Sequence, residues 1–267
     1  MVNQFFEALW QQYMAITPQA AAIHQLLAER GEQPVNDHVA LRTFGTDKLG
    51  LKALIPLIET LGYRVKGDYE FTAKNLTAVH FEHQDDPNHP KIFLSQLNIE
   101  SLPDDLQAIV AGLDAQVAPE KTGKLDFLFS GRPWVLSFAD YIQLLQVSEY
   151  AAWTAAFGYR ANHFTVSINH LLTFFEIEML NTFLLDQGFQ LNESGGQVKG
   201  TPEQLLEQSS TLADMVHVKF SDTEHTIPGC FYEFAKRYPQ SNGRLYQGFI
   251  AASADKIFES TDSQKPV

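Results

Sequence analysis

Hydrophobic and polar positions alternate along residues 36–44 (NDHVALRTF), and this alternation predicts a β-strand. Because successive side chains of a strand point to opposite faces, His38, Ala40 and Arg42 share one face. An imidazole that can hold a metal and a fixed cation would therefore line the same wall, about 13 Å apart at roughly 3.3 Å per residue. A small anionic molecule could occupy that gap. The alternative is a surface histidine beside an arginine in an ordinary salt bridge.

The same succession of patterns occurs twice along the chain. A strand, a helical pattern, a short strand and two further strands follow one another in each copy, and His38 and His163 hold matching places. Self-similarity of this kind predicts a duplicated architecture. The expected segments are 38–44, 47–61, 63–65, 76–82 and 91–96 in the first copy, and 162–168, 171–186, 189–191, 215–220 and 229–235 in the second.

The predicted fold class is α+β, because two βαβββ modules that pair edge to edge would form a half-open barrel. We expect one catalytic domain over residues 1–267. Apolar residues at helical spacing predict N-terminal helices within 1–34, and a mainly helical insert, 100–158, is expected to cover one end of the modules. The modules themselves are 35–99 and 159–238. A C-terminal segment, 239–267, contains an amphipathic stretch at 245–258 and then a polar, frayed tail at 259–267.

If both first strands line the inside of the barrel, His38 and His163 would face each other across the cavity. Glu233 lies in an otherwise apolar strand, and a carboxylate is rarely buried without a metal or a cation beside it. Two histidines and one carboxylate suit non-haem Fe(II) chemistry with O₂. His80 and His217 occupy matching places in the two copies and are rival ligands or core histidines bonded to backbone.

The first copy offers Ser95 or Gln96 where the second has Glu233, and neither is a good ligand, so one metal per chain is expected. Cys230 should face away from Glu233 and lie in the core. Phe44, Phe164 and Phe231 are candidates for cavity walls, although each also suits plain core. The other histidines are interpreted as surface residues: His24, His83, His89, His170 and His225.

Composition narrows the function further. The net charge is −13 without a basic run, which argues against nucleic acid or an anionic membrane as partner. An anionic substrate would therefore need a local cation such as Arg42. The single cysteine, Cys230, excludes an intrachain disulfide, and the N-terminus lacks the features of a signal peptide, so the cytoplasm is the expected compartment. Motifs for nucleotide binding or triad hydrolysis are absent from the sequence.

Several longer motifs resemble those of the 2-oxoadipate dioxygenase/decarboxylase family, of which this chain would be a short form. The motifs are residues 35–44 (VNDHVALRTF), 131–134 (GRPW), 148–153 (SEYAAW), 162–165 (NHFT) and 232–235 (YEFA). The resemblance covers about residues 35–240. It implies a vicinal-oxygen-chelate-like fold and an Fe(II) site. It also implies conversion of 2-oxoadipate and O₂ to 2-hydroxyglutarate and CO₂ in lysine catabolism.

The same resemblance assigns the metal ligands to His38, His163 and Glu233 and the substrate-binding arginine to Arg42. As a mechanistic hypothesis, Arg42 pairs with the distal carboxylate of a 2-oxo dicarboxylic acid as a charge-assisted fork. Two alternatives come from other classes. One is a Zn- or Ni-dependent isomerase or hydrolase of a small metabolite on the same scaffold, and the other is a non-catalytic small-molecule binder.

Overall fold

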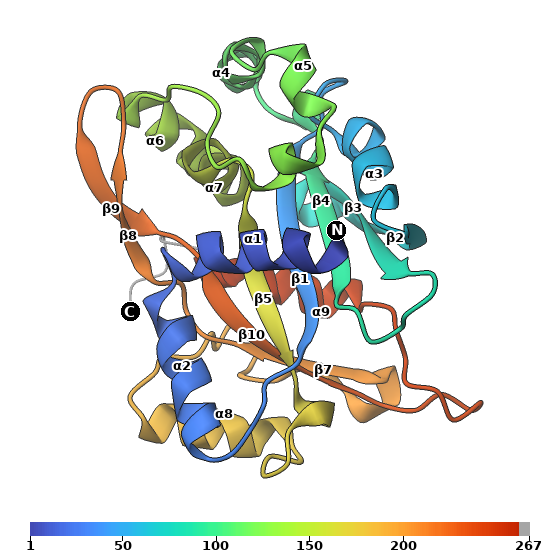
Figure 1. The fold of residues 1–267 in the computed structure, drawn as a ribbon. Helices are drawn as coiled ribbons and strands as arrows, with labels where there is room; N and C mark the ends of the chain where they lie inside the picture. Colours follow the sequence, from blue (N-terminus) through green and yellow to red (C-terminus); the bar gives the residue numbers. More distant parts are fainter. Residues whose placement is uncertain (262–267) are drawn as a thin grey trace.

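A computed structural model of the protein describes residues 1–261, and its centre is one eight-stranded, strongly curled sheet. The sheet order is β2-β3-β4-β1-β5-β10-β7-β6, so the first strand of each copy lies at the centre (Figure 1). The strands are β1 (Asn36–Phe44), β2 (Tyr63–Phe71), β3 (Leu76–His83), β4 (Lys91–Leu97), β5 (Ala161–Ser167), β6 (Lys199–Thr201), β7 (Leu206–Ser210), β8 (Met215–Lys219), β9 (Glu224–Pro228) and β10 (Phe231–Arg237).

The two predicted modules are present and meet through an antiparallel pair, β1 with β5. In the first, β1 pairs with β4 in parallel; in the second, β5 pairs with β10 in parallel. The register across the junction is reciprocal: His38 lies opposite Thr165, and Ala40 lies opposite His163. This arrangement relates the modules by an approximate two-fold axis, which brings their matching positions to adjacent strands.

The strand assignment within the second module was partly wrong. Residues 215–220 do not join the main sheet, because Met215–Lys219 (β8) pairs with Glu224–Pro228 (β9) in a separate hairpin. The module strand at that place is Leu206–Ser210, which pairs with β10. Residues 189–191 form only a single bridge, Leu191 to Thr211, and β6 takes the place of the expected short strand. Polar residues dominate β7 (LEQSS), so hydrophobic patterning gave no strand signal there.

Helices cover both faces of the sheet (Figure 1). Helix α1 crosses the face where Phe164 contacts Trp10 and Tyr13, whereas α9 lies behind the sheet in this view. The α-helices are α1 (Val2–Met14), α2 (Pro18–Glu29), α3 (Leu51–Glu59), α4 (Asp104–Ala115), α5 (Pro119–Thr122), α6 (Phe138–Val147), α7 (Glu149–Phe157), α8 (Ile177–Asp186) and α9 (Ala251–Ile257). Helix α8 is shorter than the expected 171–186, since residues 171–176 are not helical and the helix begins at Ile177.

The insert between the modules is helical, as predicted, and gathers at one end of the sheet (Figure 1). Its last helix, α7, is buried from Tyr150 to Phe157. Gly158 ends α7 with a positive φ of 65°, and a Cβ there would lie 2.4 Å from the carbonyl oxygen of Gly131. Only glycine permits both the conformation and the close approach. The chain therefore turns sharply from α7 into β5, which carries His163.

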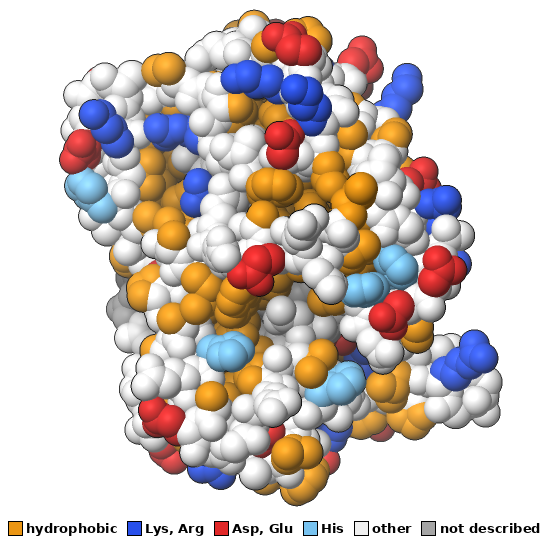
Figure 2. All heavy atoms as spheres, viewed as in Figure 1, with side chains coloured by type: hydrophobic (Ala, Val, Ile, Leu, Met, Phe, Trp, Pro, Cys, Tyr) orange, Lys and Arg blue, Asp and Glu red, His pale blue; other side chains and the backbone are white. Residues whose placement is uncertain are grey.

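The C-terminal segment returns to the sheet. The expected amphipathic stretch contains α9, and a short 3₁₀ helix, Phe258–Thr261, follows it. Ser260 and Thr261 are buried, so the expectation of a frayed tail is wrong for residues 259–261; residues 262–267 lie outside the described residues. On the face over α1 and α2, charged side chains are scattered among apolar ones (Figure 2). Among the described residues, the helices are too short or too polar to cross a membrane.

Candidate metal centre

The three predicted ligands converge on one buried face of the main sheet. One ligand atom from each of His38, His163 and Glu233 lies within 4.8 Å of the others, and this is the only such group found among residues 1–261. Nε2 of His38 is 3.4 Å from Oε1 of Glu233, and Nε2 of His163 is 3.0 Å from Oε2. The three residues are 2%, 5% and 0% exposed. Bulk water therefore cannot satisfy these polar atoms.

The expected placement of the two imidazoles requires one correction. His38 and His163 lie on neighbouring strands at the centre of the sheet, with ring centroids 5.7 Å apart, and do not face each other across a barrel. Glu233 comes from β10, the next strand beyond β5, where it pairs with Thr165. Three adjacent strands thus supply all three groups from one face.

The register also revises the expected matches between the modules. Phe93, which pairs with Ala40, is the first-module counterpart of Glu233, in place of the expected Ser95 or Gln96. Likewise, Ser210 is the second-module counterpart of His80, because each pairs with one of those two residues. The equivalence of His80 and His217 was therefore wrong. A phenylalanine at the counterpart position leaves the first module without a carboxylate ligand.

Neither rival histidine belongs to the metal group. His80 is buried and bonded on both sides: the Tyr69 hydroxyl lies 2.8 Å from Nδ1, and a Glu82 oxygen lies 3.3 Å from Nε2. His217 lies on the exposed hairpin, 2.8 Å from a carboxylate oxygen of Glu224. These contacts direct both imidazoles to partners other than the cluster of His38, His163 and Glu233.

Residues that precede the two histidines orient both rings. Nδ1 of His38 donates to Asp37 at 2.8 Å, and Nδ1 of His163 donates to the amide oxygen of Asn162 at 3.0 Å. A neutral imidazole that donates through Nδ1 presents a lone pair at Nε2. Burial lowers the pKa of His163, and the facing Glu233 carboxylate opposes this shift. Both Nε2 atoms can therefore act as metal ligands.

Glu233 supplies the negative charge. Oε1 accepts a hydrogen bond of 2.6 Å from Nε2 of Gln208, whereas Oε2 has no hydrogen-bond partner of good geometry among the described residues. Burial alone would raise the pKa of this carboxyl, but the facing imidazoles and the Gln208 amide lower it below its usual value. An ionised carboxylate and two imidazole nitrogens converge on one point, and the Thr165 hydroxyl lies 3.1 Å from Nε2 of His38. This group can hold a cation, and the donor set of two nitrogens and a carboxylate fits a divalent transition metal.

Aromatic rings form the walls of the centre. Phe231 stacks on His163 at 4.5 Å, and Phe249 meets the edge of His38 at 4.8 Å. Of the three phenylalanines predicted as candidate walls, only Phe231 contacts the metal group. Phe164 and Phe44 pack instead with Trp10 and Trp134, respectively. Cys230 is buried in the core as expected, and burial raises the pKa of its thiol to about 12.

Arg42 is buried on β1, four residues beyond His38 and on the same face. Its Nη1 contacts Glu149 at 3.1 Å, and its Nη2 donates to the Thr261 hydroxyl at 3.2 Å. The guanidinium lies over the rings of Tyr150 and Trp153, 4.9 Å from each centroid. Nε has no hydrogen-bond partner among the described residues. Arg42 therefore combines a structural ion pair with one donor that remains available.

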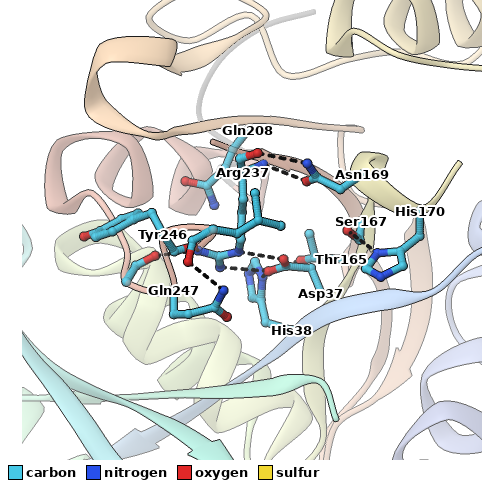
Figure 3. Close-up of polar contacts among 12 residues, drawn as sticks. Asp37, His38, Thr165, Ser167, Asn169, His170, Gln208, Arg237, Tyr246 and Gln247 are labelled. Atoms are coloured by element: carbon cyan, nitrogen blue, oxygen red, sulfur yellow. Dashed lines mark hydrogen bonds and ion pairs between the residues drawn. The ribbon is translucent and has the colours of Figure 1, made fainter. Parts of the chain in front are cut away.

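Pattern reasoning missed several polar residues around the metal group. By strand alternation Asp37 would lie on the opposite face from Arg42, but a register irregularity between Asn36 and His38 lets its carboxylate reach the ring of His38. Arg237 forms a two-point ion pair with Asp37, at 2.7 and 2.8 Å (Figure 3). Burial would raise the pKa of Asp37, but the charges of Arg237 and Lys91 hold it well below the usual value. In the sequence, the available sign of this ion pair was a charged residue in a strand toward each end of the chain, Asp37 and Arg237.

Comparison with known proteins gives a consistent assignment. The family model for 2-oxoadipate dioxygenase/decarboxylase matches residues 2–127 and 127–245. A protein of that description from Oryza sativa subsp. japonica is 33% identical over 278 aligned positions, which span 95% of this chain and 76% of the rice protein. The expected short form is thus only moderately shorter than this plant relative.

Two solved structures share the fold closely. The crystal structure of hydroxyglutarate synthase from Oryza sativa, in complex with 2-oxoadipate, is 32% identical, with a TM-score of 0.88 and coverage of 97% of this chain and 91% of that one. A structure from Shewanella frigidimarina NCIMB 400, which bears a provisional hydrolase name, is 54% identical, with a TM-score of 0.89 and coverage of 94% and 98%. The family model, the curated relative and the fold agree, and the chain belongs to the 2-oxoadipate dioxygenase/decarboxylase family.

Proposed function

We propose that this chain is an Fe(II)-dependent dioxygenase that decarboxylates a 2-oxo dicarboxylic acid. The candidate reaction is 2-oxoadipate and O₂ to 2-hydroxyglutarate and CO₂, which balances without another oxidant. Family membership and the rice relative, whose structure contains 2-oxoadipate, support this choice. The reaction would belong to lysine catabolism, and we propose the cytoplasm as its compartment.

The observation that carries the proposal is the buried convergence of two imidazole lone pairs and one carboxylate. His38, His163 and Glu233 would hold the iron, and their three bonds would leave coordination positions for a 2-oxo acid and O₂. When bound, the metal supplies the oxygen chemistry that protein side chains cannot perform. The protein contributes the ligand geometry and a site from which bulk water is excluded.

Arg42 is the candidate for substrate selection. It is a buried cation on the strand that carries His38, and its Nε donor has no partner among residues 1–261. A guanidinium binds a carboxylate more tightly and with more defined geometry than an ammonium does. We propose that Arg42 binds the distal carboxylate of the substrate, which would favour dicarboxylic over monocarboxylic 2-oxo acids. The contact with Glu149 must then loosen or be shared.

The test is oxygen uptake by metal-free protein reloaded with Fe(II) under a mild reductant. With 2-oxoadipate we expect equal molar consumption of O₂ and 2-oxo acid, together with formation of CO₂ and 2-hydroxyglutarate. Turnover without O₂ consumption, in the presence of Zn²⁺ or Ni²⁺, would instead favour the isomerase or hydrolase alternative. Binding of 2-oxoadipate without turnover under any of these metals would favour a binder.

A further inference from the structure

The two metal-binding histidines are held differently, although they occupy equivalent places. The residue before each one accepts a hydrogen bond from its Nδ1. Before His38 that residue is a carboxylate, Asp37; before His163 it is an amide, Asn162. A carboxylate partner orients a ligand histidine and increases its basicity more than a neutral amide does. The approximate two-fold symmetry of the modules is therefore broken next to the metal ligands.

Asp37 is held in turn by Arg237, at the end of β10. Nε of Arg237 donates to Oδ2 at 2.7 Å, and Nη2 donates to Oδ1 at 2.8 Å (Figure 3). Both residues are buried, with Arg237 2% exposed. A two-point ion pair of this kind fixes the plane of the carboxylate as well as its position. The orientation of the His38 ring thus depends on a residue 199 positions further along the chain.

The remaining donor group of Arg237 reaches the C-terminal segment. Nη1 donates to the carbonyl oxygens of Tyr246, at 3.0 Å, and Gly248, at 2.8 Å. These carbonyls belong to residues 245–250, which we call the strap. Figure 3 shows the Tyr246 side of this contact, with Arg237 between Tyr246 and Asp37. One guanidinium therefore contacts the strap and the carboxylate behind His38 at the same time.

The strap also contacts the metal ligand directly. The ring of Phe249 lies 4.8 Å from that of His38, at an interplanar angle of 87°. The Arg237 guanidinium lies 5.2 Å from the centroid of the Phe249 ring. The backbone N–H of Phe249 donates to the Tyr69 hydroxyl at 3.0 Å, which anchors the strap to the first module. The strap thus reaches His38 in two ways. Phe249 contacts the edge of the ring directly, and Arg237 and Asp37 link the strap to Nδ1.

We propose that Asp37 is a positioning residue that, through Arg237, couples seating of the strap to metal binding by His38. The proposal rests on the proposed function only in requiring a metal at the three ligands. A seated strap holds Arg237 and Asp37 in place, and the oriented His38 binds the metal more tightly. Binding free energies are linked reciprocally, so the metal must stabilise the seated strap by the same factor.

The first test compares metal affinity across the two modules, with Co²⁺ as an oxygen-stable probe in isothermal titration calorimetry. Asp37→Asn gives His38 the partner that His163 already has, and we expect Co²⁺ to bind about 10- to 100-fold more weakly. The visible absorption of bound Co²⁺ should also change, since the His38 ring is no longer fixed. A purely structural role for Asp37 would lower the melting temperature and leave both readouts unchanged.

The matched control is Asn162→Asp, which gives His163 a carboxylate that has no Arg237 opposite it. This variant should bind Co²⁺ within about threefold of the wild type, because an unclamped carboxylate does not fix the ring as the paired Asp37 does. Phe249→Leu serves if Asp37→Asn does not fold, since it changes the strap without removing a polar group. It should weaken Co²⁺ binding about threefold or more. Unchanged affinity in a folded Asp37→Asn or in Phe249→Leu would overturn the coupling.

The second test measures the strap itself. Arg244, next to the strap, is exposed and provides a trypsin site whose cleavage can be followed by mass spectrometry. Co²⁺ should slow this cleavage at least about fivefold in the wild type and less than twofold in Asp37→Asn. Equal cleavage with and without Co²⁺ in a wild type that binds the metal overturns the coupling alone. Failure of the wild type to bind Co²⁺ removes the metal centre, and with it both proposals.

Discussion

The two βαβββ modules share a topology but divide the chemistry unequally. The second module provides two of the three candidate metal ligands, His163 and Glu233, whereas the first provides His38 alone. At the place of Glu233 the first module has Phe93, and at the place of Ser167 it has Arg42. The duplication therefore supplies a scaffold with two related cradles on adjacent strands. We propose that differences at a few inward positions assign metal binding mainly to one cradle and anion binding to the other.

This comparison shows why the register matters more than local resemblance. Side chains that share a face are fixed by strand pairing, and one residue of slip moves each of them to the other face. The expected match between His80 and His217 was therefore misleading, because His217 lies on a hairpin outside the main sheet. The predictions below test the division of chemistry between the modules, beginning with the largest expected effect.

Replacement of Glu233 should have the largest effect. Glu233→Ala removes the only carboxylate of the metal group, and we expect metal affinity to fall by more than about 100-fold, with loss of oxygen uptake. Titration calorimetry with Co²⁺ measures the metal affinity, and an oxygen electrode measures the oxygen uptake. The counterpart variant, Phe93→Leu, should bind the metal within about threefold of the wild type and lose roughly 1–2 kcal/mol of stability. Retention of wild-type affinity in Glu233→Ala would remove Glu233 from the metal centre.

The next effect concerns the anion-binding role proposed for Arg42. Arg42→Lys loses the planar fork and should raise KM for 2-oxoadipate about 10- to 100-fold, because a charged hydrogen bond contributes about 1.5–3 kcal/mol. KM for 2-oxohexanoate, which lacks the distal carboxylate, should change less than about threefold. Ser167→Ala, at the matching place of the second module, is the control. Equal changes for both substrates would exclude Arg42 from the substrate site.

Replacement of Glu149 should test the same role of Arg42, because Glu149 is the carboxylate that pairs with its guanidinium. Glu149→Gln leaves a buried guanidinium without its carboxylate, and we expect a loss of about 1–2 kcal/mol in the free energy of unfolding, since Glu149 is partly exposed. With the metal bound, 2-oxoadipate should raise the melting temperature of this variant more than that of the wild type, because its distal carboxylate replaces the missing charge. Thermal unfolding with and without the ligand measures both effects. An identical ligand-induced shift in both proteins would contradict competition for Arg42.

The rival histidines should have the smallest effects. His80→Gln loses the contact with Tyr69 and should cost about 1 kcal/mol of stability, while Co²⁺ affinity stays within about twofold. His217→Ala changes an exposed position and should alter stability by less than about 0.5 kcal/mol. Calorimetric titration and chemical denaturation of the two variants measure these effects. A large loss of metal affinity in His80→Gln would extend the metal site into the first module.

The sequence was sufficient to predict the repeat, the convergence of His38, His163 and Glu233, and the place of Arg42 on the strand that carries His38. Each histidine lies near the start of its strand after a matching pattern, and Glu233 is the single charge in the expected strand 229–235. Other features were beyond reach because they depend on pairings between distant segments. The Arg237–Asp37 ion pair joins residues 200 positions apart, and the Arg42–Glu149 contact joins residues 107 apart. A pattern along the chain does not encode which distant charge will meet which.

The β8–β9 hairpin gives the molecule a place where its length can change without a shift of Glu233. It leaves the main sheet after Ser210 and returns at Phe231, where β7 and β10 are still direct neighbours. A longer, shorter or substituted excursion at this point would preserve the register that places Glu233. The turn at residues 221–223 is hydrogen-bonded through Ser221 and Asp222 to residues 136 and 138, so an insertion there would disturb the start of α6 and leave the three candidate ligands in place.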